Sequence, residues 1–412
     1  MMTPRDTRDD GNLTATDSWT KVRIALLVAL AFVLGSSEFV VIGIEPQIAT
    51  AFSVTLDRAG ELVSVFALAY AICTPVLALT TGRFRRFPLL VSYTVIFCAA
   101  NLVAWFAPTF TILMIARIAL GAVSGALLAQ SVTYIPELVS VKRVSPTVAI
   151  VYAAFAVAMI AATAGGKLIG DALGWHMTMA AAFWMAVIVC AAVVCALPRA
   201  GATDEPATVS DQLCLLRDPR ALSCVAIFVF GIGSVYVLYA YVTPYLEDVL
   251  GMSSLATSTA LMGYGLVCIA SNLLSGWIDA RFGMRALVPS FLIQAALLFA
   301  LYAVGGLTAP ALAIIMAIGL SMYAVSVPCV SMFMSIARTD YPRALTLSAS
   351  LEPTSFNIGI AFGTAVGGAV VAGPGMRFIG IVGSGFSLIA CALVIWTIRL
   401  AHRHRTQVSV QR

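Results

Sequence analysis

Residues 110–135, FTILMIARIALGAVSGALLAQSVTYI, decide the fold of this chain. These 26 residues contain one charged side chain, Arg117. At about 1.5 Å per residue, a helix of this length crosses a hydrocarbon core of roughly 30 Å. An arginine there costs roughly 2.5–3.5 kcal/mol on insertion scales, so we expect it to face protein or water and to have a partner. Gly121 and Gly125 lie four and eight residues further on, and they predict close approach of another helix.

The composition indicates that the whole chain, like this segment, is suited to a membrane. It is 61% hydrophobic and 10% charged, whereas a soluble domain is about 25% charged. We therefore expect a multi-pass protein embedded in a lipid bilayer. The net charge of +5 does not indicate nucleic-acid binding, because the basic residues lie in short loops between apolar runs. The nine cysteines form no CxxC pair and no two histidines share a span, so neither a metal site nor a cofactor is expected.

Twelve apolar runs predict an all-α membrane protein. Strands would alternate polar and apolar residues, which these runs do not, so helices are the expected spanning form. The predicted spans are 24–46, 60–81, 87–106, 109–136, 147–170, 176–197, 220–244, 256–278, 286–305, 309–336, 344–371 and 375–399.

The positions of Lys and Arg predict the orientation. Twenty lie in one set of loops and tails, whereas the opposite set holds three, Arg58, Lys167 and Arg377. Because positive loops remain in the cytoplasm, both termini are expected there, in the plasma (inner) membrane of a bacterium. Both termini can lie on the same side of the membrane only if the number of spans is even, and twelve is even.

The longest polar interruption divides the spans six and six. The expected units are a disordered tail at 1–21, a bundle at 22–197, a linker at 198–219, a second bundle at 220–400 and a basic tail at 401–412. A shift of 198 residues places Arg83-Phe84 on Arg281-Phe282. Such weak internal symmetry is typical of transporters built from two pseudo-symmetric six-helix bundles with a site between them.

The sequence resembles the major facilitator superfamily, within its bacterial twelve-span drug:proton antiporter branch, which includes arabinose, sugar, purine and chloramphenicol exporters. The resemblance lies in SSEFVVIGIEPQIATAF at 36–52 and AGELVSVFALAYAICTPVLAL at 59–79, and it extends over almost the whole chain past residue 20. It implies alternating access between two bundles, energised by the proton gradient.

Two charged residues are expected at matching depth in the membrane. Glu38 lies about eight residues before Pro46, and Arg117 about nine after Pro108, so both are roughly 12–13 Å below the outer ends of their helices. The resemblance places these two helices together and links Arg117 to proton coupling. We expect a direct or water-bridged ion pair whose protonation is linked to substrate binding. The alternative is a permanent pair that only fixes helix packing.

Other charged residues are weaker candidates. Glu352, beside Pro353 within a span, predicts a kinked stretch that recognises a proton or cation. Glu45 is expected at the outer mouth. Lys167 and Asp171, spaced i,i+4, are expected to form a local surface pair.

The superfamily has a characteristic motif of glycine, acidic and basic residues in the cytoplasmic turn after the second span of a bundle. Residues 276–285, GWIDARFGMR, match this motif in the second half. By resemblance it forms a gate built from Gly276, Asp279, Arg281, Gly283 and Arg285. The equivalent turn after the second span, Gly82-Arg83-Phe84-Arg85-Arg86, lacks the acid, so a basic loop that only fixes topology is equally expected there. Small residues predict helix packing or hinges at Gly121, Gly125, Gly165, Gly166, Gly170, Gly359, Gly363 and Gly367.

The resemblance names the first, fourth, seventh and tenth spans as cavity-lining. Aromatic and methionine side chains there suit an amphipathic organic solute; ordinary packing is the alternative for each. These candidates are Gln130, Tyr236, Tyr239, Tyr241, Met322 and Tyr323. The expected function is proton-coupled export of such a solute by a monomer, with proton-coupled import of a sugar or nucleoside as the alternative. An intramembrane enzyme is not expected, because no HExxH motif, histidine pair or deeply placed aspartate occurs in a span.

Overall fold

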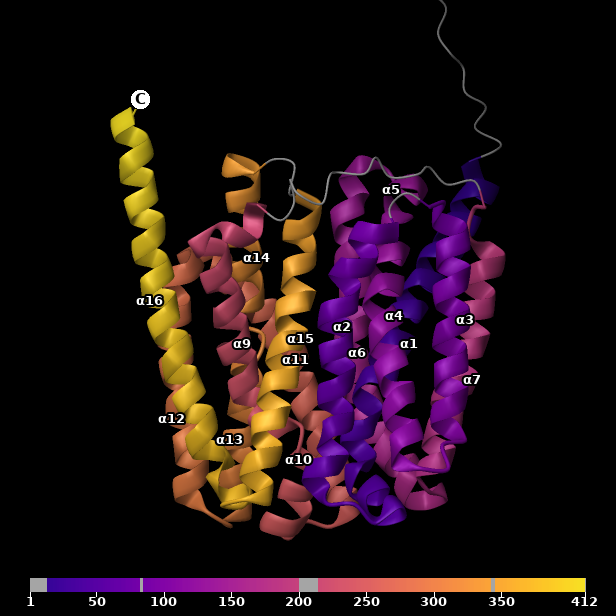
Figure 1. The fold of residues 1–412 in the computed structure, drawn as a ribbon, viewed down its shortest axis with the longest axis vertical. Helices are drawn as coiled ribbons and strands as arrows, with labels where there is room; N and C mark the ends of the chain where they lie inside the picture. The colour runs from indigo at the N-terminus through magenta and orange to yellow at the C-terminus, as the bar shows by residue number, and fades with distance from the viewer. Residues whose placement is uncertain (1–12, 82–83, 200–213, 342–344, 412) are drawn as a thin grey trace, which may run out of the picture.

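The chain folds as two groups of long, roughly parallel helices (Figure 1). The computed structural model describes residues 13–81, 84–199, 214–341 and 345–411, and every regular element in those ranges is helical. The elements of the first group are α1 (Leu13–Phe52), α2 (Leu56–Thr81), α3 (Arg86–Trp105), α4 (Phe110–Thr133), α5 (Ile135–Leu138), α6 (Val141–Leu173) and α7 (Trp175–Ala196). Those that follow are η1 (Cys214–Arg217), α9 (Pro219–Tyr239), α10 (Val242–Pro244), η2 (Tyr245–Val249), α11 (Ser254–Phe282), η3 (Gly283–Ala286), α12 (Leu287–Val304), α13 (Thr308–Ser321), α14 (Ser326–Asp340), α15 (Leu345–Ala372), η5 (Met376–Phe378) and α16 (Ile379–Gln411).

Eleven helical stretches in these ranges are long and apolar enough to cross a membrane. One of them, Ser254–Val304, has 51 residues and contains two helices, α11 and α12. The first ends at Gly283, whose φ of +56° is a conformation that L side chains rarely adopt. Counting α11 and α12 separately gives the twelve predicted crossings, so the all-α prediction is confirmed.

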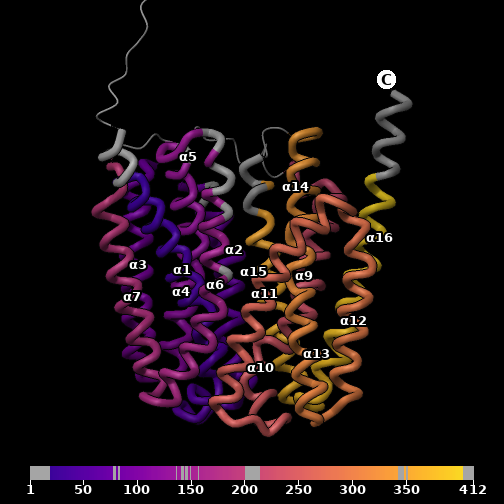
Figure 2. The backbone as a smooth tube through the Cα atoms, turned by 180° about the vertical axis from the view of Figure 1, so that it is seen from behind, coloured from indigo at the N-terminus to yellow at the C-terminus, as the bar shows by residue number. Residues whose placement is uncertain are grey.

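The two groups of helices, α1–α7 and α9–α16, meet along two helix pairs. Helix α2 packs against α15, and α6 packs against α11, as the views from both sides show (Figures 1 and 2). The start of α1 and the end of α16 lie at one end of the bundle, and α10 lies at the other. We call the end that carries α10 the outer end, following the orientation that the basic residues predict.

The predicted disordered tail is wrong in part, and the last helix of the second bundle extends beyond its predicted end at residue 400. Residues 13–21 already belong to α1, and α16 continues through Gln411; residues 1–12 lie outside the described ranges. A helix, once formed, extends cheaply into polar sequence that tolerates it, because each added residue gains one hydrogen bond. Part of the predicted linker is also ordered, since η1 covers Cys214–Arg217 and α9 begins at Pro219.

Most of the predicted packing glycines lie at helix crossings. A Cβ on Gly121 would come within 2.2 Å of the Phe66 carbonyl oxygen of α2, and one on Gly363 within 2.5 Å of the Gly233 oxygen of α9. A Cβ would also meet a neighbouring helix at less than 3.0 Å at Gly125, Gly166, Gly170, Gly359 and Gly367. Close packing is not found at Gly165, where an added Cβ would meet nothing within 4 Å; a hinge at this position stays a prediction.

Candidate functional site

Arg117 joins three helices of the first group. Its side chain is 1% exposed, and its guanidinium donates hydrogen bonds to main-chain carbonyls. Nε binds Leu62 O of α2 at 3.2 Å, Nη2 binds Glu38 O of α1 at 2.8 Å, and Nη1 binds Ser37 O. The guanidinium also lies 4.4 Å from the centre of the Phe66 ring. The cost of burying this charge is therefore offset by three carbonyl dipoles and an aromatic face.

Glu38 lies beside this arginine without pairing to it. The residue is 3% exposed, and neither carboxylate oxygen accepts a hydrogen bond from the part of the chain that the structure describes. The direct ion pair predicted with Arg117 is absent, because the donors of the guanidinium are taken up by main-chain oxygens of α1 and α2. The membrane depth counted along each helix correctly predicted that the two residues are neighbours. It could not indicate which oxygen of Glu38 the arginine would bind.

Aromatic rings from the second group form a buried cluster. Tyr239 stacks on Tyr264 with ring centres 5.1 Å apart, and Tyr323 stacks on Phe356 at 5.6 Å. Tyr236 lies edge-on to Tyr239 at 5.5 Å and to Phe356 at 6.3 Å. We call these five residues the aromatic cluster. Helices α9, α11 and α15 and the break between α13 and α14 contribute to it.

The aromatic cluster lies at the interface of the two halves. Tyr239 Oη is 3.3 Å from Thr163 Oγ1 of α6, and Tyr323 Oη donates to Met159 Sδ of α6 at 3.6 Å. On the side of the second half, the Tyr264 hydroxyl donates to Met322 Sδ at 3.8 Å. Tyrosine hydroxyls and polarisable sulfur atoms therefore surround the rings.

Both candidate acids lie near this cluster. The Tyr323 hydroxyl interacts electrostatically with the carboxylates of Glu38 and Glu352, and Tyr236 does so with Glu38. The Tyr236 hydroxyl is buried and has no hydrogen-bond partner within the described ranges. Glu352 is half-buried in α15, which is helical on both sides of Pro353. One acid from each half thus interacts electrostatically with Tyr323.

Two of the predicted cavity residues lie elsewhere. Gln130 is close to the inner end of α4, where Nε2 donates to Arg86 O at 3.3 Å. Tyr241 lies at the outer end, where its hydroxyl donates to Thr364 O of α15 at 3.2 Å. Tyr236, Tyr239, Met322 and Tyr323 do come together. Tyr264, Phe356 and Met159 were missed, because they lie on spans that the family resemblance does not name as cavity-lining.

Charged residues at the outer end are more buried than expected. Lys167 Nζ of α6 lies 2.6 Å from Glu247 Oε1 and 3.0 Å from Asp171 Oδ2. Lys167 is 3% exposed, so the expected local surface pair is instead a buried ammonium group held by two carboxylates. Glu45 is completely buried as well, so it does not line an open mouth.

Asp279 and Arg281 of the predicted gating turn contact side chains of the second half. Asp279 accepts a 2.6 Å hydrogen bond from Ser331 of α14, and the Arg281 guanidinium lies 5.3 Å from the Trp277 ring. An added Cβ on Gly276 would meet nothing within 4 Å, so this glycine is not required for close packing.

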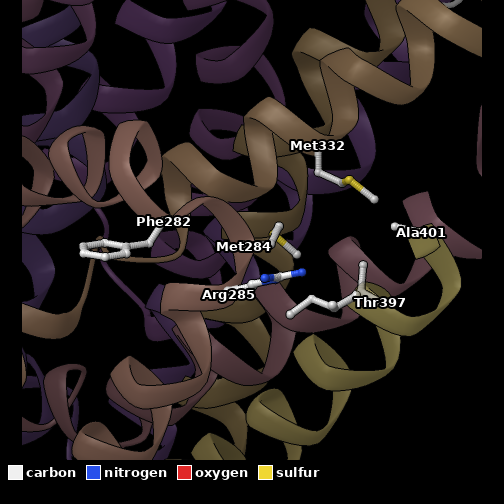
Figure 3. Close-up of a pocket in the computed structure, with 7 residues that line it drawn as sticks. Phe282, Met284, Arg285, Met332, Thr397 and Ala401 are labelled. Carbon is white, nitrogen blue, oxygen red and sulfur yellow. The ribbon is translucent and has the colours of Figure 1, made fainter. Parts of the chain in front are cut away.

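Arg285, in the following turn η3, lines a cavity of about 390 Å³ near the inner end of α11. Figure 3 shows its guanidinium between Met284 and Thr397, whereas the ring of Phe282 points away from them. This cavity lies within the second half and away from the interface where the aromatic cluster lies.

The structure brings together a buried acid, a buried arginine and an aromatic cluster where two groups of membrane-spanning helices meet, which is the arrangement expected of a carrier. The sequence profile of the Major Facilitator Superfamily matches residues 27–350. The chain belongs to this superfamily. Its members are membrane transporters rather than enzymes.

Two relatives within this superfamily carry informative names. The inner membrane transport protein YdhP of Escherichia coli (strain K12) is 27% identical over 370 residues, which cover 90% of this chain and 94% of that protein. A probable sugar efflux transporter of Mannheimia succiniciproducens is 23% identical over 382 residues, which cover 91% of this chain and 93% of that protein.

Solved structures of the superfamily share the fold. A bacterial homologue of the human lysosomal transporter Spinster, in an inward-facing and occupied conformation, superimposes with a TM-score of 0.73 at 16% identity, covering 94% of this chain and 97% of that one. A D-xylose–proton symporter superimposes with a TM-score of 0.69 at 16% identity, covering 90% and 96%.

Proposed function

We propose that this superfamily member is a proton-coupled secondary carrier that exports a small amphipathic organic solute. The observation that carries the proposal is Glu38, a buried carboxyl group without a hydrogen-bond partner in the described ranges, beside the aromatic cluster. A buried carboxylate needs donors or a counter-charge in order to hold its charge. Gain or loss of its proton is therefore coupled to movement of the groups around it.

The chemistry of the cluster indicates the solute. Stacked tyrosine and phenylalanine rings offer flat apolar faces, whereas hydroxyl groups and methionine sulfur offer a few polar contacts. This combination favours an amphipathic molecule over a bare ion. The name of the Mannheimia relative supports export. A gradient of 100 mV supplies roughly 2.3 kcal/mol per charge moved, enough for a concentration ratio of tens-fold.

Proton movement in everted membrane vesicles tests the function and its direction. Aromatic amphiphiles, nucleosides and sugars would be added singly to vesicles that hold an acidic lumen, while a pH-sensitive dye reports the lumenal pH. Export by antiport predicts loss of lumenal protons when a substrate is added. Import by symport, which the likeness to the D-xylose–proton symporter makes the second candidate, predicts proton entry into unenergised vesicles instead. No response to any compound in either assay would contradict proton coupling.

A further inference from the structure

The cavity beside Arg285 has no part in the proposed function. Its volume of about 390 Å³ is within the range of small-molecule sites, about 300–1,000 Å³. The turn η3, which carries Arg285, packs against α11, α12, α14 and α16. The cavity therefore belongs to the inner end of the second half (Figure 1).

One charged group and several apolar side chains line this cavity. Figure 3 shows the Arg285 guanidinium between Met284 and Thr397. The Thr397 hydroxyl bonds to Ser223 Oγ at 2.9 Å and to Leu393 O at 2.8 Å, so its polar group is already used. Arg285 supplies the charge of the lining. The remaining lining residues are apolar, namely Phe282, Met284, Met332, Ile398 and Ala401.

Exposed tryptophans indicate the depth of the cavity in the membrane. Trp277 lies near the end of α11, and Trp396 directly precedes Thr397 in α16; both are more than half exposed. Tryptophan side chains gather at the boundary between the bilayer and water. The cavity is therefore at the level of the lipid headgroups, on the side that the basic residues predict to be cytoplasmic.

The sequence around the cavity is basic. Residues 276–285 contain two arginines and one aspartate, and the aspartate accepts a hydrogen bond from Ser331 of α14. In α16, Arg399 follows Thr397, and the sequence continues as HRHR at 402–405. Basic pockets between helices on the cytoplasmic side favour anionic headgroups, and each Lys or Arg near an anionic leaflet contributes about 1 kcal/mol.

We propose that this cavity binds the headgroup of an anionic phospholipid from the inner leaflet. The Arg285 guanidinium donates to the phosphate oxygens, for which its planar fork is well suited. Met284, Met332 and Ile398 contact the apolar part of the lipid next to the headgroup. A soluble phosphate would leave these side chains in water, whereas a lipid covers them.

The bound lipid connects η3 to α14 and α16, and so it stabilises the inner end of the second half. This site does not rest on the proposed function, because it depends neither on the direction of transport nor on the solute.

Native mass spectrometry of the purified full chain in a neutral detergent tests the site. The probes are dioleoyl phosphatidylglycerol, which is anionic, dioleoyl phosphatidylcholine, which is zwitterionic, and glycerol phosphate, which is soluble. The proposal predicts saturable binding of phosphatidylglycerol with a higher affinity than phosphatidylcholine. Glycerol phosphate should not bind at the concentration that saturates the site with phosphatidylglycerol. The apparent unfolding temperature should rise along the same titration.

Substitutions in the lining separate charge from shape. Arg285→Gln should weaken phosphatidylglycerol binding about tenfold or more, because a charge-assisted hydrogen bond is lost. Arg285→Lys should recover part of the affinity, since lysine binds phosphate as a point charge. Ala401→Phe keeps every charge but fills the cavity, so it should weaken binding as well. The matched control is Arg399→Gln, a basic residue of α16 outside the lining, which should change the affinity less than about twofold.

Equal affinities of Arg285→Gln and the parent would overturn the proposal. So would an equal loss in Arg399→Gln, which would assign the effect to general surface charge. Binding of glycerol phosphate as tight as that of phosphatidylglycerol would assign the cavity to a soluble phosphate instead. Each variant must elute as a single folded species in size-exclusion chromatography. Should Arg285→Gln fail this, Ala401→Phe decides, together with the preference of the parent for the anionic lipid.

Discussion

Arg117 binds the main-chain oxygen of Glu38 at 2.8 Å and leaves the carboxylate of the same residue without a hydrogen bond in the described ranges. The two charged groups are neighbours, yet they have separate tasks. The arginine holds α1, α2 and α4 together through main-chain oxygens. The proposed proton exchange requires an acid of this kind, because no hydrogen bond in the described ranges depends on the charge of its carboxylate.

Glu38→Gln should preserve the fold and remove proton coupling. The amide has the same shape, and no ion pair is lost, so the apparent unfolding temperature in detergent should change little. Proton movement in response to substrate should fall to the level of vesicles without the carrier. Undiminished coupled transport would contradict the role of Glu38. Glu61→Gln, at an exposed pair, is the matched control.

Arg117→Lys should destabilise the first half although the charge is retained. A lysine cannot donate to Leu62, Ser37 and Glu38 oxygens from one planar group. Loss of two charge-assisted hydrogen bonds predicts a destabilisation of about 3 kcal/mol. Thermal unfolding in detergent measures it, with Arg58→Lys at the surface as the comparison. A midpoint equal to that of the control would show that the three bonds are not needed.

Gly60→Ala should disturb the packing of α2 against Tyr241. The new methyl group would occupy the place of the Tyr241 hydroxyl, so we expect the apparent unfolding temperature in detergent to fall. Gly165→Ala is the matched control, because an added Cβ there would meet nothing within 4 Å. Alanine also favours a helix more than glycine does, so this variant should be slightly more stable. Equal unfolding temperatures in the two variants would show that close packing at Gly60 does not stabilise the protein.

Tyr236→Phe should change substrate binding without lowering the stability of the fold. The Tyr236 hydroxyl has no partner in the described ranges, so its removal should leave stability unchanged or raise it by up to about 1 kcal/mol. If the hydroxyl binds the solute, transport should show a higher KM. Tyr239→Phe instead loses a contact with Thr163 and should lower stability by about 1 kcal/mol. An unchanged KM in Tyr236→Phe would exclude that hydroxyl from the binding site.

Asp218→Asn should weaken the start of α9 in a pH-dependent manner. Asp218 caps that helix and lies 2.6 Å from Arg220, which also lies 2.5 Å from Asp340. Burial opposes ionisation of Asp218, but the hydrogen bonds from Arg220 outweigh it and lower the pKa of this carboxyl below its ordinary 3.8. The stabilisation is therefore present above that pH and is lost as pH falls through the folded-state pKa.

At pH 7 the asparagine variant should unfold about 1–2 kcal/mol more easily than the parent. The difference should shrink as pH falls through the folded-state pKa of Asp218, which lies below 3.8, because the parent carboxyl then becomes protonated as well. Thermal unfolding at pH 7 and below that pKa measures this. A difference that is the same at both would assign the effect to the shape of the cap rather than to its charge.

Several features follow from the amino-acid sequence alone. The twelve crossings are predicted because each apolar run of about 20 residues can satisfy its backbone in a bilayer only as a helix. The shared depth of Glu38 and Arg117 follows in the same way from the rise per residue, counted from Pro46 and Pro108. Pro46 also implies that the carbonyl of Ile42 has no N–H partner four residues later in its own helix.

Only the tertiary structure decided which partners those groups find. In the folded protein Arg117 donates to main-chain oxygens and not to a carboxylate. Glu247 forms an ion pair with Lys167, and the ring of Tyr241 packs against Gly60. Gln130 lies away from the aromatic cluster, whereas Tyr264 belongs to it. These pairings join residues tens to hundreds of positions apart, and the angle at which helices cross determines them. Periodicity within one helix sets which residues share a face, but it does not specify the neighbour that the face will meet.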